Sequence, residues 1–230
     1  MLQLQAAQIC LPVGLSREEL QHIDKRLVAV RHKVPRSGKL FEAGHRFDAV
    51  YAVWTGCFKT CIQSSSGHEQ LTGFQMSGEL IGLDGIGTRQ HAVDAVALED
   101  SQVCEIPFAE LEALSLEVTS LQQQFYRVMS HEIMRNQGVM LLLGSMHAEE
   151  RLAAFLLNLT HRLAVRGFSS SALVLRMSRI DIGSYLGLTI ETVSCTFSNL
   201  QADGLIEVNR RQINIVRPAG LQALVDGNGG

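Results

Sequence analysis

Polar side chains recur along one side of a short predicted helix in the C-terminal third of the chain. Glu191, Ser194 and Cys195 share this side, and Arg210 and Arg211 follow in a predicted loop. A carboxylate can accept a hydrogen bond from cytosine N4, and a hydroxyl can bond to several base edges. Arginine side chains suit phosphate oxygens, which supply most sequence-independent affinity for DNA. These residue types therefore indicate a surface that binds double-stranded DNA.

Two short helices are predicted to position this surface. Ser178 is placed to cap the first helix and Thr189 to cap the second, while Gly187 ends the first and permits a tight turn. Apolar residues repeat at three- and four-residue spacing in both helices, and we expect them to face inward: Ile180, Ile182, Tyr185 and Leu186 in the first, and Ile190, Val193, Phe197 and Leu200 in the second. The pattern predicts a helix-turn-helix.

A β-hairpin is predicted directly after the second helix. Residues 205–208 pair with residues 212–216 across the loop that holds Arg210 and Arg211. A helical hairpin without a ligand occurs in many folds, but the order and spacing of these elements favour a winged helix.

Composition limits the other classes of protein. The chain has 230 residues, a formal net charge of −3 and five irregularly spaced cysteines. It holds no apolar run of about eighteen residues and no signal-peptide pattern, so we expect a cytoplasmic protein with reduced thiols that does not enter a membrane. Because the charge is not basic, DNA binding would depend on a few well-placed arginines and on dimerisation.

Short β-rich runs separated by glycine turns fill the chain from Val34 to about Pro107. They lie at residues 40–44, 50–56, 58–62, 70–82 and 93–106. This pattern predicts an antiparallel barrel or jelly roll.

From Phe108 to about Leu143 the pattern becomes helical and carries a heptad seam. The seam consists of Tyr126, Met129, Ile133, Asn136, Met140 and Leu143. Such a stripe can pack on its own barrel, but a polar Asn within a long seam favours a parallel coiled-coil homodimer. Two recognition helices about 34 Å apart would then read an inverted repeat.

These segments together predict an α+β protein with three parts. Residues 1–107 form an N-terminal β-roll sensor domain, residues 108–145 a dimerisation helix, and residues 146–230 a winged helix-turn-helix domain.

The chain resembles the Crp/Fnr transcription regulators, and within them the oxygen-sensing fumarate and nitrate reduction regulator branch. The matching stretches are LFEAG, QLTGFQMSGELIGLDGIG, VCEIPF, LLLGSMHAEERLAAFLLNLTHRLAVRGFS and DIGSYLGLTIETVS. The resemblance implies that the β-roll sensor domain is a jelly roll like those that bind cyclic nucleotides. It also implies a cytoplasmic activator or repressor that contacts RNA polymerase through surface loops of this domain. Residues 85–91 are the best match for such a loop.

The recognition helix departs from the family pattern at one position. That pattern reads Glu-x-x-Ser-Arg and implies a TTGAT-like half-site; Glu191 and Ser194 match it, whereas Cys195 stands where arginine is expected. An arginine fork on guanine contributes about 1 to 3 kcal/mol of base discrimination, and a thiol cannot replace it. Partial readout of the half-site is therefore expected.

The resemblance also implies four cysteine ligands for a [4Fe-4S] cluster. Cys10 and Cys104 match the last two ligand positions, but Leu4 and Met1 stand at the others. Cys57 and Cys61 are predicted to lie on one strand about 13 Å apart, too far to replace them. We therefore assign no cofactor, and a cluster is expected only if a longer natural N-terminus supplies further cysteines.

Two further departures concern the effector. The family branch places an acid at the position of Asn136, where like charges oppose each other across the dimer, so the amide favours a dimer without cofactor. The cyclic-AMP-binding branch holds phosphate with an Arg-Ser pair where this chain has His91-Ala92. Arg89 lies close by, but we interpret it as a solvated loop residue, so no nucleotide is expected.

Two other functions stay open at this point. His45, His68, Glu69 and His91 could serve a cupin-like metal enzyme, but no H-x-H pair exists and we place these histidines on loops or at the surface. The second possible function is that of a protein-interaction adaptor whose recognition helix no longer reads DNA. The sequence favours a regulator over both, and an enzyme is not expected.

Overall fold

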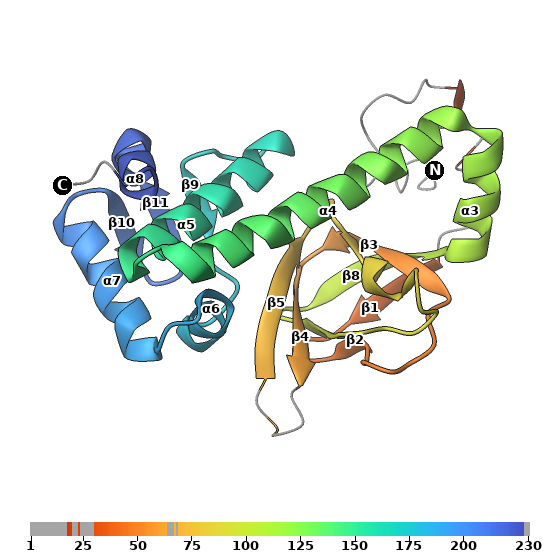
Figure 1. The fold of residues 1–230 in the computed structure, drawn as a ribbon, viewed down its shortest axis with the longest axis horizontal. Helices are drawn as coiled ribbons and strands as arrows, with labels where there is room; N and C mark the ends of the chain where they lie inside the picture. The colour runs from red at the N-terminus through yellow and green to blue at the C-terminus, as the bar shows by residue number, and fades with distance from the viewer. Residues whose placement is uncertain (1–17, 20–22, 24–29, 64–66, 68, 228–230) are drawn as a thin grey trace. The chain divides into compact units, whose positions relative to one another are not determined.

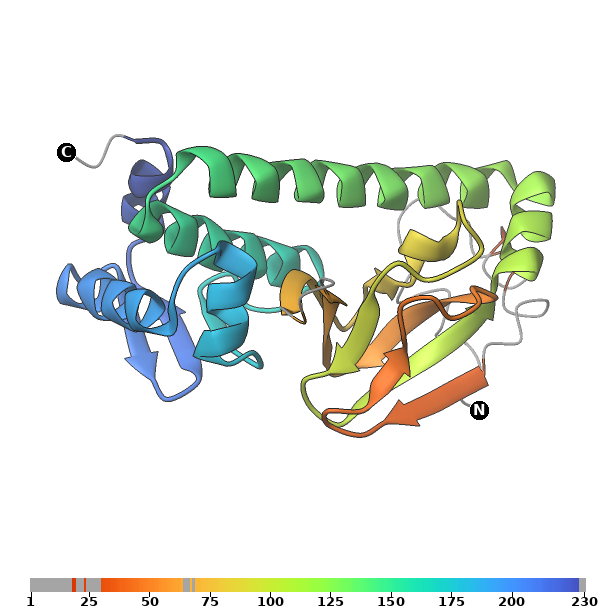
Figure 2. The same ribbon diagram turned by 60° about the horizontal axis from the view of Figure 1, so that its bottom comes forward.

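The computed structural model describes residues 18–19, 23, 30–63, 67 and 69–227. They form two compact units, one that ends at Met134 and one that begins at Arg135, and each is described by itself (Figures 1 and 2). No helix in the described ranges is long and apolar enough to cross a membrane.

The N-terminal unit is built from two four-stranded antiparallel sheets. One has the order β1-β8-β3-β6 and the other β2-β7-β4-β5. The strands are β1 (Val30–Val34), β2 (Lys39–Phe41), β3 (Ala49–Thr55), β4 (Cys57–Gln63), β5 (Glu69–Met76), β6 (Leu80–Ile81), β7 (Asp94–Ala97) and β8 (Ser101–Pro107), with the short 3-10 helix η1 at Leu83–Gly85. The predicted β-roll is confirmed. The strand β1 was not predicted, because only Val34 of its five residues is buried.

The strands β3 and β8 separate two cores. Val53 and Val103 point between the sheets, toward Phe41 and Phe58. Their neighbours Ala52 and Cys104 point the other way, where helices α3 and α4 cover the sheet. Since alternate strand residues face opposite sides, both faces of this sheet are buried, which explains the near-continuous apolar run of β3.

The dimerisation helix predicted over residues 108–145 is interrupted at one point. The structure has α3 (Phe108–Glu117) and α4 (Thr119–Ser145), separated by Val118 in an extended conformation with φ −118° and ψ 93°. Leu114 of α3 and Leu121 of α4 both pack into the same core. The break at Val118 lets α4 leave the direction of α3 while both helices pack on this core (Figure 1), so tertiary packing overrides the continuous helical pattern.

The C-terminal unit contains the predicted helix-turn-helix and wing. Its elements are the last turns of α4, then α5 (Ala148–Val165), β9 (Ala172–Val174), α6 (Arg179–Leu186), α7 (Ile190–Ala202), β10 (Ile206–Asn209), β11 (Gln212–Ile215) and α8 (Pro218–Val225). The strands form one antiparallel sheet in the order β10-β11-β9. The wing hairpin is confirmed, and β9 adds a third strand that the sequence pattern did not predict.

The caps of α6 and α7 agree with the prediction. Ser178 Oγ accepts a hydrogen bond from the Asp181 amide, Thr189 Oγ1 accepts one from the Thr192 amide, and Gly187 ends α6 in the left-handed region at φ 63°. Two of the predicted inward residues are wrong: the side chains of Ile180 and Ile190 are 67% and 41% exposed. Each lies in the first turn of its helix, beyond the reach of the core.

Gly183 in α6 leaves no room for a side chain. A Cβ at this position would lie 2.6 Å from the main-chain oxygen of Leu188, which cannot move without opening the turn. We expect Gly183→Ala to lower the free energy of unfolding of the C-terminal unit by about 1 to 3 kcal/mol, measured by denaturant titration. Gly138→Ala is the control, because nothing lies within 4 Å of its added Cβ, and it should be neutral or slightly stabilising. Equal destabilisation by both changes would contradict the packing at Gly183.

Candidate nucleic-acid interface

The outer face of α7 is polar and exposed. Glu191, Ser194 and Cys195 are all exposed, while Val193 and Phe197 are buried against the rest of the domain. The hydroxyl of Ser194 donates to the main-chain oxygen of Ile190 at 2.8 Å. Its lone pairs therefore stay available, so toward a base Ser194 presents an acceptor.

The N-terminus of α7 is prepared for an anion. Thr189 is exposed and caps the helix through its Oγ1, 3.2 Å from the Thr192 amide. Because the first amides of a helix have no partner within the helix and the helix dipole is positive at this end, a phosphate oxygen is favoured here.

The wing places two exposed arginines at its tip. Asn209 and Gln212 form the last pair of the hairpin, so Arg210 and Arg211 make a two-residue turn. Arg210 has φ 55°, a left-handed conformation that is unfavourable for a residue with a Cβ. Among the described residues no carboxylate pairs with either guanidinium, which leaves both charges for phosphate.

The face of α7 also borders an acidic hollow within the same domain. The hollow has a volume of about 660 Å³ and is lined by His147, Ala148, Glu149, Glu150, Glu191, Thr192, Cys195, Thr196, Asn199 and Leu224. The Asn199 side chain donates to Glu149 Oε1 at 2.7 Å, which fixes a carboxylate beside the recognition helix. The helical pattern could not predict this neighbour, because Glu149 lies fifty residues earlier in the chain.

A further cation, Arg179, lies at the start of α6. Its guanidinium carbon is 3.2 Å from the ring centroid of Phe197 on α7, and burial lowers its pKa. The stacked cation holds the two helices of the motif together. Sequence reasoning did not single out this residue, because the contact joins two separate helices.

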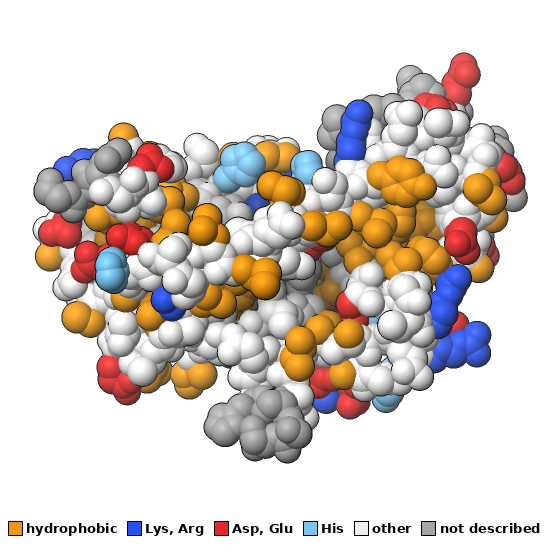
Figure 3. Space-filling model, viewed as in Figure 1, with side chains coloured by type: hydrophobic (Ala, Val, Ile, Leu, Met, Phe, Trp, Pro, Cys, Tyr) orange, Lys and Arg blue, Asp and Glu red, His pale blue; other side chains and the backbone are white. Residues whose placement is uncertain are grey.

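The predicted seam of α4 is largely exposed. Tyr126, Ile133 and Met140 are 59%, 55% and 73% exposed, and Asn136 is exposed as well. Met129 and Leu143 are partly buried, and Met129 packs against the core of the N-terminal unit. In Figure 3, hydrophobic side chains lie along the path that α4 takes in Figure 1. The alternative that the whole stripe packs on its own β-roll therefore does not hold.

The described cysteines do not fit a [4Fe-4S] cluster. Cys57, Cys61 and Cys104 are buried in the β-roll and Cys195 is exposed on α7, while Cys10 lies outside the described residues. Such a cluster needs four converging ligands, nearly always thiolates. In the part of the chain that the structure describes, no group of three or more His, Cys, Asp or Glu residues could hold a metal. Cys57 and Cys61 are strand residues of the roll, as predicted.

The prediction that His91 lies on a loop or at the surface is wrong. The residue lies inside the β-roll. It is 4% exposed, and its ring stacks on Phe41 with 3.7 Å between centroids. Its Nδ1 lies 3.4 Å from Asp84, whose other oxygen accepts from the Ala92 amide. The prediction failed because His91 follows an exposed loop but turns inward onto an aromatic ring. His45 is exposed, and His68 lies outside the described residues.

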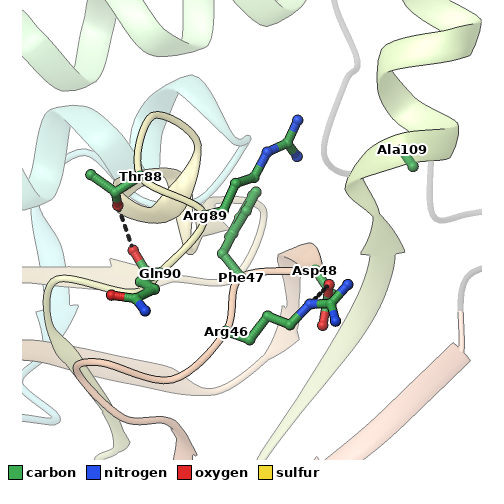
Figure 4. Close-up of a pocket in the computed structure, with 7 residues that line it drawn as sticks. All are labelled: Arg46, Phe47, Asp48, Thr88, Arg89, Gln90 and Ala109. Atoms are coloured by element: carbon green, nitrogen blue, oxygen red, sulfur yellow. Dashed lines mark hydrogen bonds and ion pairs between the residues drawn. The ribbon is translucent and has the colours of Figure 1, made fainter.

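Arg89 extends from the loop toward α3, as Figure 4 shows. Its side chain is 59% exposed, with its guanidinium 5.2 Å from the Phe108 ring centroid and 3.8 Å from Glu112. It borders a hollow of about 640 Å³ lined by Arg46, Phe47, Asp48, Thr88, Arg89, Gln90 and Ala109. The predicted solvated arginine is confirmed, and Arg46 in the same hollow already pairs with Asp48.

Comparison with known proteins agrees with this arrangement. Residues 150–224 match the Crp-like helix-turn-helix domain, and residues 31–117 match the cyclic nucleotide-binding domain. The transcriptional regulatory protein btr of Bordetella pertussis is 48% identical over 217 residues, which cover 94% of this chain and 89% of the relative. The chain belongs to the Crp/Fnr family.

Within the Crp/Fnr family the chain falls in the Fnr-like branch. The fumarate and nitrate reduction regulatory protein of Salmonella typhimurium is 42% identical and covers 95% of this chain and 87% of the relative. The solved structure of FixK2 from Bradyrhizobium japonicum is similar with a TM-score of 0.79 and 31% identity, covering 86% of this chain and 98% of FixK2. The chain is therefore a DNA-binding transcription regulator, and its family is not one of enzymes.

The burial of the cysteines in this Crp/Fnr regulator generates a test. Burial raises the pKa of Cys61 to about 11 and raises that of Cys104 as well. We expect iodoacetamide at pH 8 to modify Cys195 and to spare Cys57, Cys61 and Cys104 in the folded chain, as read by peptide mass spectrometry. Rapid modification of Cys61 would contradict its placement on β4.

The raised pKa of Cys61 predicts that the stability of the folded chain changes with pH. Because folding raises the pKa of Cys61 above its ordinary value of 9.0 to about 11, its contribution to stability is complete below pH 9 and is lost as pH rises toward 11. Denaturant midpoints measured between pH 8 and 11 should fall less in Cys61→Ala than in the unchanged chain.

Proposed function

We propose that this regulator acts as a homodimer that binds an inverted repeat of TTGAT-like half-sites in response to oxygen or redox state. The observation that carries the proposal is the exposed apolar seam of α4, followed in the same chain by an exposed polar recognition helix. A dimer joined along α4 presents two copies of α7, as an inverted repeat requires.

The dimer is supported by what α4 leaves exposed. Of the seam residues, Tyr126, Ile133 and Met140 are 59%, 55% and 73% exposed. Exposed apolar side chains grouped on one helix favour burial against a partner. A second α4 has the matching pattern, because a two-fold axis pairs a surface with itself.

Asn136 is an uncharged residue in the seam, at a position where the resemblance implies an acid. Two carboxylates opposed across a dimer would repel by on the order of a kcal/mol at partly screened sites. The amide carries no charge, so we propose that the dimer forms without a cofactor.

The contacts with DNA follow from the chemistry of each side chain. Glu191 accepts from cytosine N4, and Ser194 accepts from a neighbouring base through its free lone pairs. Thr189 and the wing residues Arg210 and Arg211 lie near phosphate. Cys195 gives no fork for guanine, so the half-site is read in part.

The signal and the partner of this regulator are also proposals. A relative from Pasteurella multocida is named anaerobic regulatory protein, and one from Pseudomonas protegens is named transcriptional activator protein Anr. We propose a similar role as a cytoplasmic activator, without a [4Fe-4S] cluster held by the residues described above. The exposed loop residues 87–90 are proposed to contact RNA polymerase, whereas the buried His91 is not.

The departure at Cys195 favours one second candidate, an adaptor whose recognition helix no longer reads DNA. Binding to a TTGAT-N4-ATCAA duplex distinguishes the DNA-binding regulator from the adaptor. We expect this chain to bind the duplex. A second duplex has another base in place of the half-site guanine, and we expect Cys195→Arg to discriminate against it more strongly than the unchanged chain does, by about 1 to 3 kcal/mol. Fluorescence anisotropy over a salt series measures both constants. Cys195→Ser is the control, because it has no fork either.

Two results would contradict this account of the recognition helix. Equal discrimination by the unchanged chain and Cys195→Arg would show that the arginine position does not read guanine. Absence of salt-dependent binding to any duplex by folded dimers would favour the adaptor.

The proposed seam is tested by restoring the acid. We expect Asn136→Asp to raise the dissociation constant of the dimer about tenfold, because two carboxylates then oppose each other. Sedimentation equilibrium in reducing buffer measures this constant. His131→Asp is the control, since His131 is exposed on the side of α4 away from the seam. An unchanged chain that stays monomeric at micromolar concentration would refute the dimer.

A further inference from the structure

The guanidinium of Arg151 joins three segments of the C-terminal unit. From the first turn of α5, Nε donates to the main-chain oxygen of Met146 at 2.8 Å. Nη1 donates to Leu186 O at 2.9 Å, and Nη2 donates to Leu143 O at 3.0 Å. Within the described residues these main-chain oxygens are its hydrogen-bond partners, and no carboxylate pairs with it.

The three oxygens lie where two helices end. Leu143 O belongs to the last turn of α4, which ends at Ser145, and Leu186 O belongs to the last residue of α6. The final carbonyls of a helix have no amide partner within the helix, and a cation near them also complements the helix dipole. One side chain thus completes the C-terminal ends of the dimerisation helix and of the first helix of the helix-turn-helix.

Close packing reinforces this junction. Gly187, in the turn between α6 and α7, has φ 63°. A Cβ on this residue would lie 3.2 Å from Leu143 Cδ2 and 3.4 Å from Arg151 Nη1. Leu143 is the last residue of the seam, so the end of the proposed dimer interface contacts the turn that precedes the recognition helix.

We propose that Arg151 is the positioning residue that fixes the direction of the helix-turn-helix relative to α4. The inference rests on the proposed homodimer and deepens it, because two such junctions determine the spacing between the two copies of α7. If this junction is rigid, only one half-site separation fits both recognition helices. If it is loose, several separations fit.

Arginine is suited to this task in a way that lysine is not. Its planar group directs N–H donors along several fixed directions, whereas a lysine ammonium is a single point of charge. Here Nε, Nη1 and Nη2 each serve a different segment. Lysine would keep the charge near the helix ends but could not hold all three oxygens in one geometry.

The first experiment compares half-site spacings. The full chain, Arg151→Gln, Arg151→Lys and the control Arg166→Gln are titrated against duplexes with TTGAT and ATCAA separated by four or six base pairs, and against a single half-site. Two extra base pairs move one half-site by about 7 Å along the axis and rotate it around the duplex. Arg166 is a matched control, because it lies at the other end of α5 and also donates to a main-chain oxygen, that of Arg162.

We expect the unchanged chain and Arg166→Gln to prefer the four-base-pair spacer by at least about tenfold. In both Arg151 variants this preference should fall to within about threefold, while half-site affinity and the dimer constant stay unchanged. A loss that is equal for all three duplexes and parallels a lower unfolding midpoint would mean that Arg151 only stabilises the fold, and would overturn the proposal. An unaltered preference would overturn it as well.

If the unchanged chain binds no duplex, the proposed function fails but the role of Arg151 can still be tested. The second experiment does this without DNA. Amide hydrogen exchange is followed at Met146, which donates to Leu142 O, and at Leu188, which donates to Gly183 O. We expect Arg151→Gln to speed exchange at both sites by about tenfold, since both segments lose a charged partner. Exchange within α7 should match that of Arg166→Gln. Acceleration at only one site, or at neither, would show that Arg151 does not couple them.

Discussion

The apolar face of α4 is the constraint on which the regulator depends. Ile133 and Met140 are more than half exposed, and covering such side chains is the main favourable term in protein association. The same helix is anchored at its start, where Leu121 and Phe125 pack into the core below the β-roll. At its end, Leu143 and the oxygens bound by Arg151 meet the helix-turn-helix. The proposed dimer interface therefore lies on the same helix that meets the helix-turn-helix.

The departures from the family are concentrated where a signal or a base would be read. Cys195 replaces the expected arginine, Asn136 an acid, and His91 fills the roll against Phe41. Cys104 is buried in the β-roll, and no group of three metal-ligating side chains forms around it among the described residues. The fold of the family is present in this chain. The residues that differ are those to which the resemblance assigns base recognition and the response to an effector.

Periodicity predicted most of the architecture, because the β-roll, the seam and the winged helix each repeat apolar residues at a spacing set by their own backbone. It could not predict the break at Val118, where two helices compete for one core, or the exposure of Ile180 and Ile190 at helix starts. The inward turn of His91 and the contacts of Arg151 and Glu149 join residues distant in sequence. Such contacts follow from tertiary packing, which no local pattern encodes.

The most direct measurement is the distance between the two recognition helices of a dimer bound to the inverted repeat. A nitroxide label at the exposed C-cap of α7 (Asp203→Cys), with Cys10 and Cys195 changed to serine, allows pulsed electron paramagnetic resonance to measure this distance without a label on the DNA face, because the other three cysteines are buried. The account predicts one narrow distribution in the range of one duplex turn, about 34 Å. Absence of a dipolar signal with DNA bound, or a distribution far from one turn, would contradict a homodimer that reads two half-sites.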